Sequence, residues 1–232
     1  MKIYVLTLFP QTVNSFFEES IIKRAIAKKI IDLQIINIRD FAKGAHKSVD
    51  DKPYGGGKGM LLKVDVLYLA LSSIKPKPYT ILLSASGNKY NQRLTAKLST
   101  NKSLAIICGH YEGIDARIEQ YVDDIISIGD YVLTGGEIAA AAVVDSVVRL
   151  LPGVISPEST KEESFSKLST IDYRLSTILE YPQYTRPENF KGIKVPKILL
   201  GGNHKEIENW RKLQSTKRTK KFRPDLLSTE KE

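Results

Sequence analysis

The chain has 232 residues, of which 42% are hydrophobic and 26% charged, a composition typical of a globular protein with a real core. A single cysteine, Cys108, excludes an intramolecular disulfide framework and a cysteine-cluster zinc site. No stretch approaches the roughly 20 apolar residues of a membrane span, and Met1–Phe9 has the pattern of a strand, not of a signal peptide. We therefore expect a cytoplasmic protein with no membrane partner. Its net charge of +9 is unevenly spread along the chain.

Short apolar runs rich in β-branched residues alternate with segments that have helical periodicity. Strands that are apolar on both faces and alternate with helices predict an α/β layer with a mainly parallel sheet. The strands are expected at Ile3–Phe9, Leu33–Ile38, Thr80–Ser84, Leu104–Cys108 and Ile125–Ile128. The helices are expected at Glu19–Ile31, Val64–Ser73, Asn91–Ser99 and Ile114–Tyr121.

A small-residue helix is expected at Glu137–Leu151, and its alanines suit packing against another helix or subunit. It ends at Pro152-Gly153, and a Ser/Thr-rich tract follows that is typical of a functional loop or a disordered linker. A further helix is expected at His204–Gln214. We therefore expect an α/β domain at residues 1–155, a flexible linker at 156–178 and a small helical, basic domain at 179–232.

A basic run extends from Arg211 to Arg223, with seven lysines or arginines and no acid. Such a run attracts a polyanion through counterion release. A solvated, partly frayed tail is the other interpretation, and charge alone does not choose between the two.

The glycine-rich segment Pro53–Met60 resembles a P-loop only superficially. Lys52 stands where the first glycine of that motif belongs, and Gly59 stands where Ser or Thr should follow Lys58. No strand is followed by the Gly-x-Gly-x-x-Gly turn of a dinucleotide site either. A flexible turn and a backbone surface that lets RNA come close both remain open.

Three glycine-bearing loops each follow a predicted strand: Ser84–Gly87, Gly109–Asp115 and Ile128–Gly136. Ligands of open α/β sheets bind beyond the carboxyl ends of strands, so these loops predict a small-molecule site, although any one of them could be a structural turn. His110, in the second loop, is spaced with no other histidine as a metal ligand, and we expect a structural or ligand-contact role for it.

The chain resembles the bacterial tRNA (guanine-N1)-methyltransferases, a family of the SPOUT methyltransferases. The resemblance covers nearly the whole chain, and the order of its motifs is highly specific. The segments that carry it are Thr7–Pro10, Val49–Leu61, Cys108-Gly-His-Tyr-Glu-Gly-Ile-Asp115, Ser127–Glu137, Leu179-Glu-Tyr-Pro-Gln-Tyr-Thr-Arg-Pro187 and Gly202–Arg211.

The resemblance implies a sheet threaded as a deep trefoil knot, a homodimer with a composite active site, and S-adenosyl-L-methionine as methyl donor to N1 of the guanine at tRNA position 37. Family members also favour Mg²⁺, for which this sequence offers no ligand set. Alanines at positions 85 and 139 replace prolines that are common in the family. The implied cofactor contacts are Leu82, Leu83, Gly109, Tyr111, Glu112, Ile128, Gly129, Asp130, Tyr131, Val132, Leu133, Gly135 and Gly136.

Guanine N1 carries a proton at neutral pH, so a carboxylate must accept it as the methyl arrives. Arg149 is a candidate to stabilise the charge that grows on O6, although a surface pair with Asp145 is the default explanation of its spacing. The family carries its base in an Asp-Ser-Phe run. Glu163 keeps the Ser-Phe here, whereas Asp172 keeps the spacing to Glu180. The distance along the chain to Glu180 favours Asp172. The remaining interpretation is that both acids are solvated charges of the linker.

Two other functions stay open from sequence alone. One is a non-catalytic RNA-binding protein, which would explain the basic run but not the three loops. The other is a different knotted RNA methyltransferase, acting on ribose 2′-OH or on rRNA.

Overall fold

The computed structural model describes residues 1–156, 163–165 and 178–227. The chain divides into two compact units, Met1–Ile155 and Ser156–Glu232, and each is described by itself. Asp172 and most of the predicted linker lie outside the described residues.

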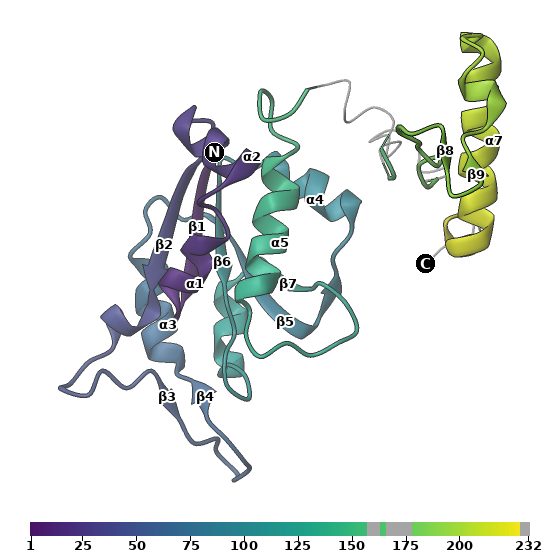
Figure 1. Cartoon of the computed structure of the whole chain (residues 1–232). Helices are drawn as coiled ribbons and strands as arrows, with labels where there is room; N and C mark the ends of the chain where they lie inside the picture. The colour runs from purple at the N-terminus through teal and green to yellow at the C-terminus, as the bar shows by residue number, and fades with distance from the viewer. Residues whose placement is uncertain (157–162, 166–177, 228–232) are drawn as a thin grey trace. The chain divides into compact units, whose positions relative to one another are not determined.

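The first unit is built on a five-stranded sheet with the order β2-β1-β6-β5-β7, and all four strand pairings are parallel (Figure 1). This confirms the predicted α/β class with a mainly parallel sheet. The strands are β1 (Lys2–Thr7), β2 (Asp32–Asn37), β5 (Tyr79–Lys89), β6 (Ser103–Ile107) and β7 (Asp124–Ser127).

Helices cover both faces of this sheet. In β1, Ile3 and Val5 enter one hydrophobic core while Tyr4 and Leu6 enter the other, because successive side chains of a strand point to opposite faces. The first core is closed by α1 (Pro10–Ser15), α2 (Ser20–Ala27), α4 (Gln92–Ser99) and α5 (Glu137–Val148). The second is closed by α3 (Val64–Ser72) and the 3₁₀ turns η1 (Ile38–Phe41) and η2 (Ala116–Tyr121).

An antiparallel hairpin leaves this body between η1 and α3. Its strands are β3 (Asp50–Asp51) and β4 (Leu61–Leu62), and we call the connecting residues Lys52–Met60 the glycine arm. Figure 1 shows the hairpin extending away from the sheet.

Three sequence expectations are corrected in the first unit. The strand expected at Thr80–Ser84 continues to Lys89, because Leu83 and Asn88 both pair with Ile126 and the residues between them bulge out. The helix expected at Ile114–Tyr121 is a 3₁₀ turn that begins only at Ala116, because Ile114 bridges to Leu62. The apolar face of α5 is buried in its own core and is not free for a partner.

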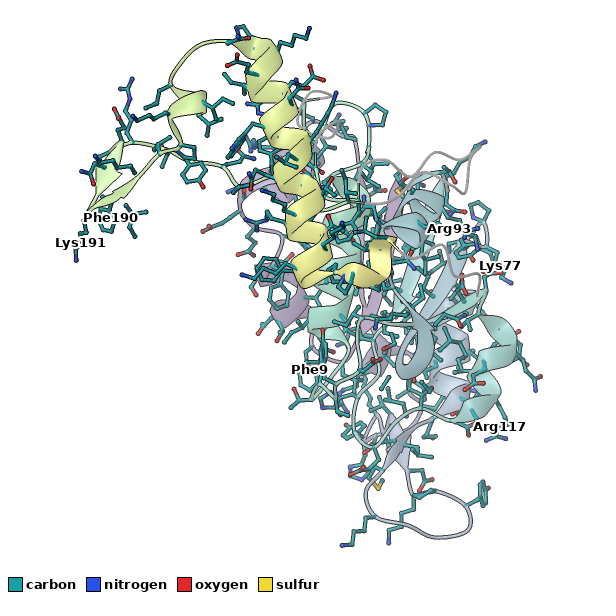
Figure 2. The ribbon with its side chains drawn as sticks, turned by 90° about the vertical axis from the view of Figure 1, so that its right-hand side faces the viewer. Phe9, Lys77, Arg93, Arg117, Phe190 and Lys191 are labelled. Carbon is teal, nitrogen blue, oxygen red and sulfur yellow. The ribbon has the colours of Figure 1, made fainter. Side chains whose placement is uncertain are left out.

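The second unit contains a hairpin and one long helix. The hairpin pairs β8 (Asn189–Phe190) with β9 (Ile193–Lys194), and Phe190 and Lys191 lie at its tip (Figure 2). The elements that follow are η3 (Lys197–Leu199), α7 (His204–Phe222) and η4 (Pro224–Leu227).

Most of the basic run expected to be a tail is therefore the C-terminal half of α7. Ser215 and Thr219 form the buried face of this half, and the Thr219 hydroxyl accepts a hydrogen bond from the Leu179 N–H at 2.9 Å. The lysines and arginines between and after them point outward and are exposed. Among the helices that the structure describes, none is long and apolar enough to cross a membrane.

Candidate active site

The three predicted loops meet at the carboxyl edge of the sheet around a cavity of about 260 Å³. Every residue predicted to contact the cofactor lines this cavity except Asp130. Asp130 is exposed instead, and its carboxylate lies 3.6 Å from the ammonium of Lys89. Sequence reasoning did not anticipate the contribution of η2, whose Ile118 and Glu119 also line the cavity. Only the packing of η2 against α3 brings them there.

Close backbone contacts fix the loops relative to one another. The Gly136 N–H donates to the Gly109 carbonyl at 2.8 Å and so joins the loop after β7 to the loop after β6. A Cβ atom on Gly136 would lie 2.7 Å from the Cys108 Cα atom, which leaves no room for a side chain. Within the loop after β7, the Ser127 hydroxyl donates to the Gly129 carbonyl at 3.0 Å.

A buried carboxylate joins the helix that follows these loops to the end of β1. Glu137, in the first turn of α5, is only 7% exposed, and its Oε1 atom accepts a hydrogen bond of 2.7 Å from the Thr7 hydroxyl at the end of β1. The helix N-terminus favours a negative charge at this position. Burial, and secondarily the nearby Glu137 charge, raise the pKa of the Cys108 thiol, so Cys108 is the buried, neutral thiol of an ordinary core residue.

His110 also lines the cavity, and its ring packs between two aromatic side chains. The ring centroid lies 4.8 Å from that of Phe9 and 4.9 Å from that of Tyr111. No hydrogen-bond partner among the described residues reaches its buried Nδ1 atom. This environment agrees with the expected structural or ligand-contact role.

The charge of the cavity lining is opposite to that of the whole chain. Glu112, Asp115 and Glu119 line it, and within the part of the chain that the structure describes no lysine or arginine does. Arg117 lies just outside, with its side chain projecting from η2 into solvent (Figure 2). Its hydrogen bonds to Asp115, at 2.6 and 2.9 Å, hold the pKa of that carboxyl below its usual range. The acidic side chains of the lining therefore favour a ligand that carries positive charge.

Comparison with known proteins agrees with this geometry. The family described as tRNA (guanine-1)-methyltransferase TrmD matches residues 1–229. The chain belongs to this family. Proteins named tRNA (guanine-N(1)-)-methyltransferase are similar over nearly their whole length. The one from Borreliella burgdorferi is 53% identical, covering 97% of this chain and 92% of its own. The one from Carboxydothermus hydrogenoformans is 52% identical (98% and 87%), and that from Malacoplasma penetrans 50% (97% and 96%).

Neither of the catalytic candidates that the structure describes, Arg149 and Glu163, lines the cavity. Arg149 caps the C-terminal end of α5. It lies ten residues after Ala139, the last residue of this helix that lines the cavity, which corresponds to about 15 Å along the helix axis. Glu163 belongs to the second unit, and Asp172 lies outside the described residues.

Ser164, the neighbour of Glu163, accepts a hydrogen bond of 2.9 Å from the Glu180 N–H through its hydroxyl. This contact ties the Ser-Phe step directly to the start of the Leu179–Pro187 segment. As for metals, the described residues contain no group of three His, Cys, Asp or Glu side chains that could hold an ion.

Proposed function

We propose that the chain transfers a methyl group from S-adenosyl-L-methionine to N1 of the guanine at tRNA position 37, next to the anticodon. The observation that carries the proposal is an acid-lined, loop-built cavity in a chain of this family. Because tRNA is a cytoplasmic substrate, we propose that the protein works in the cytoplasm.

The cavity suits this donor on three grounds. S-adenosylmethionine carries a positive sulfonium and an ammonium group, which Glu112 and Glu119 would attract. The backbone groups of the glycine loops would hydrogen-bond its adenine and ribose. When bound, the donor supplies a methyl group on sulfur, and the sulfur leaves as a neutral thioether.

We further propose that the sheet is threaded as a trefoil knot, as in related enzymes. Two close passages of the backbone support it. A Cβ atom on Gly87 would lie 2.5 Å from the Ile126 nitrogen, and the one on Gly136 would nearly touch Cys108.

The chemistry assigns one task to each polar group. A carboxylate accepts the N1 proton while the N1 lone pair forms the new bond to the methyl carbon. The sequence favours Asp172 as this carboxylate through its distance along the chain from Glu180 and because it keeps the aspartate of the family. The Ser164 hydrogen bond weakens the distance argument, since it connects the Glu163 neighbourhood to Glu180 directly. We therefore propose Glu163 as the proton acceptor.

Arg149 would stabilise the negative charge that develops on guanine O6. Its distance from the cavity of its own chain, about 15 Å along α5, supports a homodimer in which it serves the cavity of the second copy. Residues 179–232, with the basic half of α7, would hold the tRNA backbone, and 156–178 would connect them to the methyltransferase domain.

The decisive experiment is mass mapping of nucleosides after the protein, S-adenosylmethionine and a tRNA transcript have been incubated together. We expect N1-methylguanosine at position 37. Methylation of a ribose would assign the chain to a different reaction. Absence of any cofactor binding in calorimetry would indicate a non-catalytic RNA-binding protein.

The choice of base is tested by Glu163→Gln and Asp172→Asn in single-turnover assays with saturating tRNA and cofactor. We expect Glu163→Gln to slow methyl transfer by on the order of 100-fold or more, in line with the contribution of a general base. Asp172→Asn is the matched control and should stay near the wild-type rate. The reverse result would make Asp172 the base, and two near-normal variants would leave both acids without a catalytic role.

A further inference from the structure

The glycine arm is attached directly to the rim of the proposed cofactor cavity. The Met60 carbonyl accepts a hydrogen bond of 3.2 Å from the Glu112 N–H, and the Leu62 N–H donates to the Gly113 carbonyl at 3.0 Å. A Cβ atom on Gly59 would lie 2.1 Å from the Glu112 Cγ atom, so the arm packs tightly on this cavity residue. These contacts fix the root of the arm relative to the cavity.

Beyond this root, the arm is open to solvent. Gly55, Gly56 and Gly57 all have positive φ, and a Cβ atom on Gly55 or Gly56 would meet nothing within 4 Å. The glycines therefore do not make room for neighbouring protein atoms. They shape a turn whose bare backbone another molecule can approach closely.

Tyr54 stands at this turn with 98% of its surface exposed, the highest value among the exposed large apolar side chains of the described residues. Lys52 and Lys58 flank it, both exposed, and no acid lies within the arm. An exposed aromatic ring between cations is the combination that binds single-stranded nucleic acid, because the ring stacks on a base while the cations meet phosphates. An apolar protein partner would not need the two lysines.

We propose that Tyr54 is a stacking platform for an unpaired base in the anticodon loop of the substrate tRNA, with Lys52 and Lys58 against the neighbouring phosphates. The inference rests on the proposed function, because it takes tRNA as the substrate. Through Glu112, the arm sets the distance between the stacked base and the cofactor cavity. It thereby contributes to placing the target guanine.

The test compares Tyr54→Ala with Tyr54→Phe in equilibrium binding of an unmodified tRNA transcript. We expect Tyr54→Ala to raise the tRNA Kd about 10-fold, within the range for base–aromatic stacking, and Tyr54→Phe to bind like the wild type. The exposed aromatic control is Phe16→Ala at the end of α1, a residue 44% exposed and outside the cavity lining, which should bind tRNA normally. The Kd for S-adenosylmethionine should be the same in all four proteins.

The salt dependence of tRNA binding distinguishes the contribution of the Tyr54 ring from that of the two lysines. Removal of the ring should leave the slope of log Kd against log salt concentration unchanged. Lys52→Ala and Lys58→Ala should each reduce the slope by roughly 0.7, the single-strand value per phosphate. The stacked base is then identified with transcripts that carry one abasic residue in the anticodon loop. At the correct position, the abasic change and Tyr54→Ala should be strongly non-additive.

Three results would overturn the inference: normal tRNA binding by Tyr54→Ala, additivity at every loop position, or conversion of a dimer to a monomer by Tyr54→Ala in sedimentation. The last would make the arm an interface between two copies of the chain. Failure of the proposed function is distinguishable, because it would appear as absence of N1-methylguanosine with the wild-type protein, whereas these measurements concern binding alone.

Discussion

Glu137 links the end of β1 to the first turn of α5 through one buried hydrogen bond. Glu137→Ala leaves the Thr7 hydroxyl without this acceptor in the core, and we expect a decrease of about 1–3 kcal/mol in the free energy of unfolding. Glu137→Gln keeps an oxygen at the same position and should recover most of that decrease. Denaturant unfolding measures both. Equal destabilisation by the two variants would show that the charge, not the hydrogen bond, matters.

Gly136 is the residue at which a single added methyl group should disturb the cofactor cavity most directly. In Gly136→Ala the new Cβ atom collides with the Cys108 backbone, so the loop must shift and its bond to Gly109 is strained. We expect the free energy of unfolding to fall by about 1–3 kcal/mol and the cofactor Kd to rise at least about tenfold.

Calorimetry with S-adenosylmethionine measures the effect of Gly136→Ala on the cofactor. Gly201→Ala is the matched control, since its Cβ atom would meet nothing closer than 3.8 Å and its φ is not positive. Normal cofactor affinity in Gly136→Ala would mean that the loop after β7 does not contribute to the site.

Among the elements, α7 is the one that we expect to bind the tRNA backbone. Its residues Lys217, Arg218, Lys220 and Lys221 are exposed, while Thr219 faces inward. Replacing the four cations with alanine should weaken tRNA binding and reduce the salt slope by roughly 0.9 for each phosphate that the protein no longer neutralises. Cofactor affinity should not change. A variant with alanine at four exposed lysines of the first unit, Lys23, Lys28, Lys75 and Lys77, controls for net charge. A slope unchanged by the α7 substitutions would mean that the α7 cations do not contact phosphates.

The strands of the sheet were predictable because their signal is local. Runs such as Leu104–Cys108 are apolar on both faces, and only a sheet covered by helices buries both. The prediction failed where a long-range contact decides the conformation. Ser215 and Thr219 lack an apolar periodicity, so the second half of α7 could not be recognised. Its inner face is polar and depends in part on the backbone N–H of Leu179, 40 residues away.

The cavity was predictable for a related reason, since the carboxyl ends of parallel strands meet at one edge and glycines mark the loops there. What lies around it was not predictable. Glu119 enters the lining through the packing of η2, and the bulge after Leu83 depends on pairing with Ile126. Neither feature leaves a sequence pattern, because each joins segments that are distant along the chain.

At the scale of the whole molecule, exposed apolar side chains occur at the beginning of α5 and in the loop before it. Tyr131, Val132 and Ile138 are 55%, 88% and 54% exposed, and Tyr131 and Val132 belong to the cavity lining. Exposed apolar side chains at a ligand site are typical of a surface that another molecule covers. It replaces the alanines of α5 as the physical reason to expect a homodimer, since those alanines largely pack inside their own chain.

The composite active site is tested by mixing two impaired variants. Arg149→Ala removes the cation and Gly136→Ala weakens cofactor binding, so at a cofactor concentration well below the raised Kd each homodimer should lose most of its activity. If Arg149 serves the cavity of the second copy, a mixed dimer contains one cavity and one arginine that are intact and face each other. Random pairing in a two-fold dimer makes half of the molecules mixed, with one of two sites working. Co-expression should therefore restore about a quarter of the wild-type methylation rate.

The controls for this experiment are the two homodimers purified separately and a mixture prepared without subunit exchange, which should stay impaired. Sedimentation establishes that the co-expressed protein is a dimer. A complete lack of recovery in a dimer of mixed composition would mean that Arg149 acts within its own chain, which the length of α5 makes difficult, or takes no part in the reaction. An active monomer at assay concentration would remove the composite site altogether. Recovery, in contrast, requires that the second copy supply the arginine across the distance of about 15 Å along α5, because neither variant chain holds both groups.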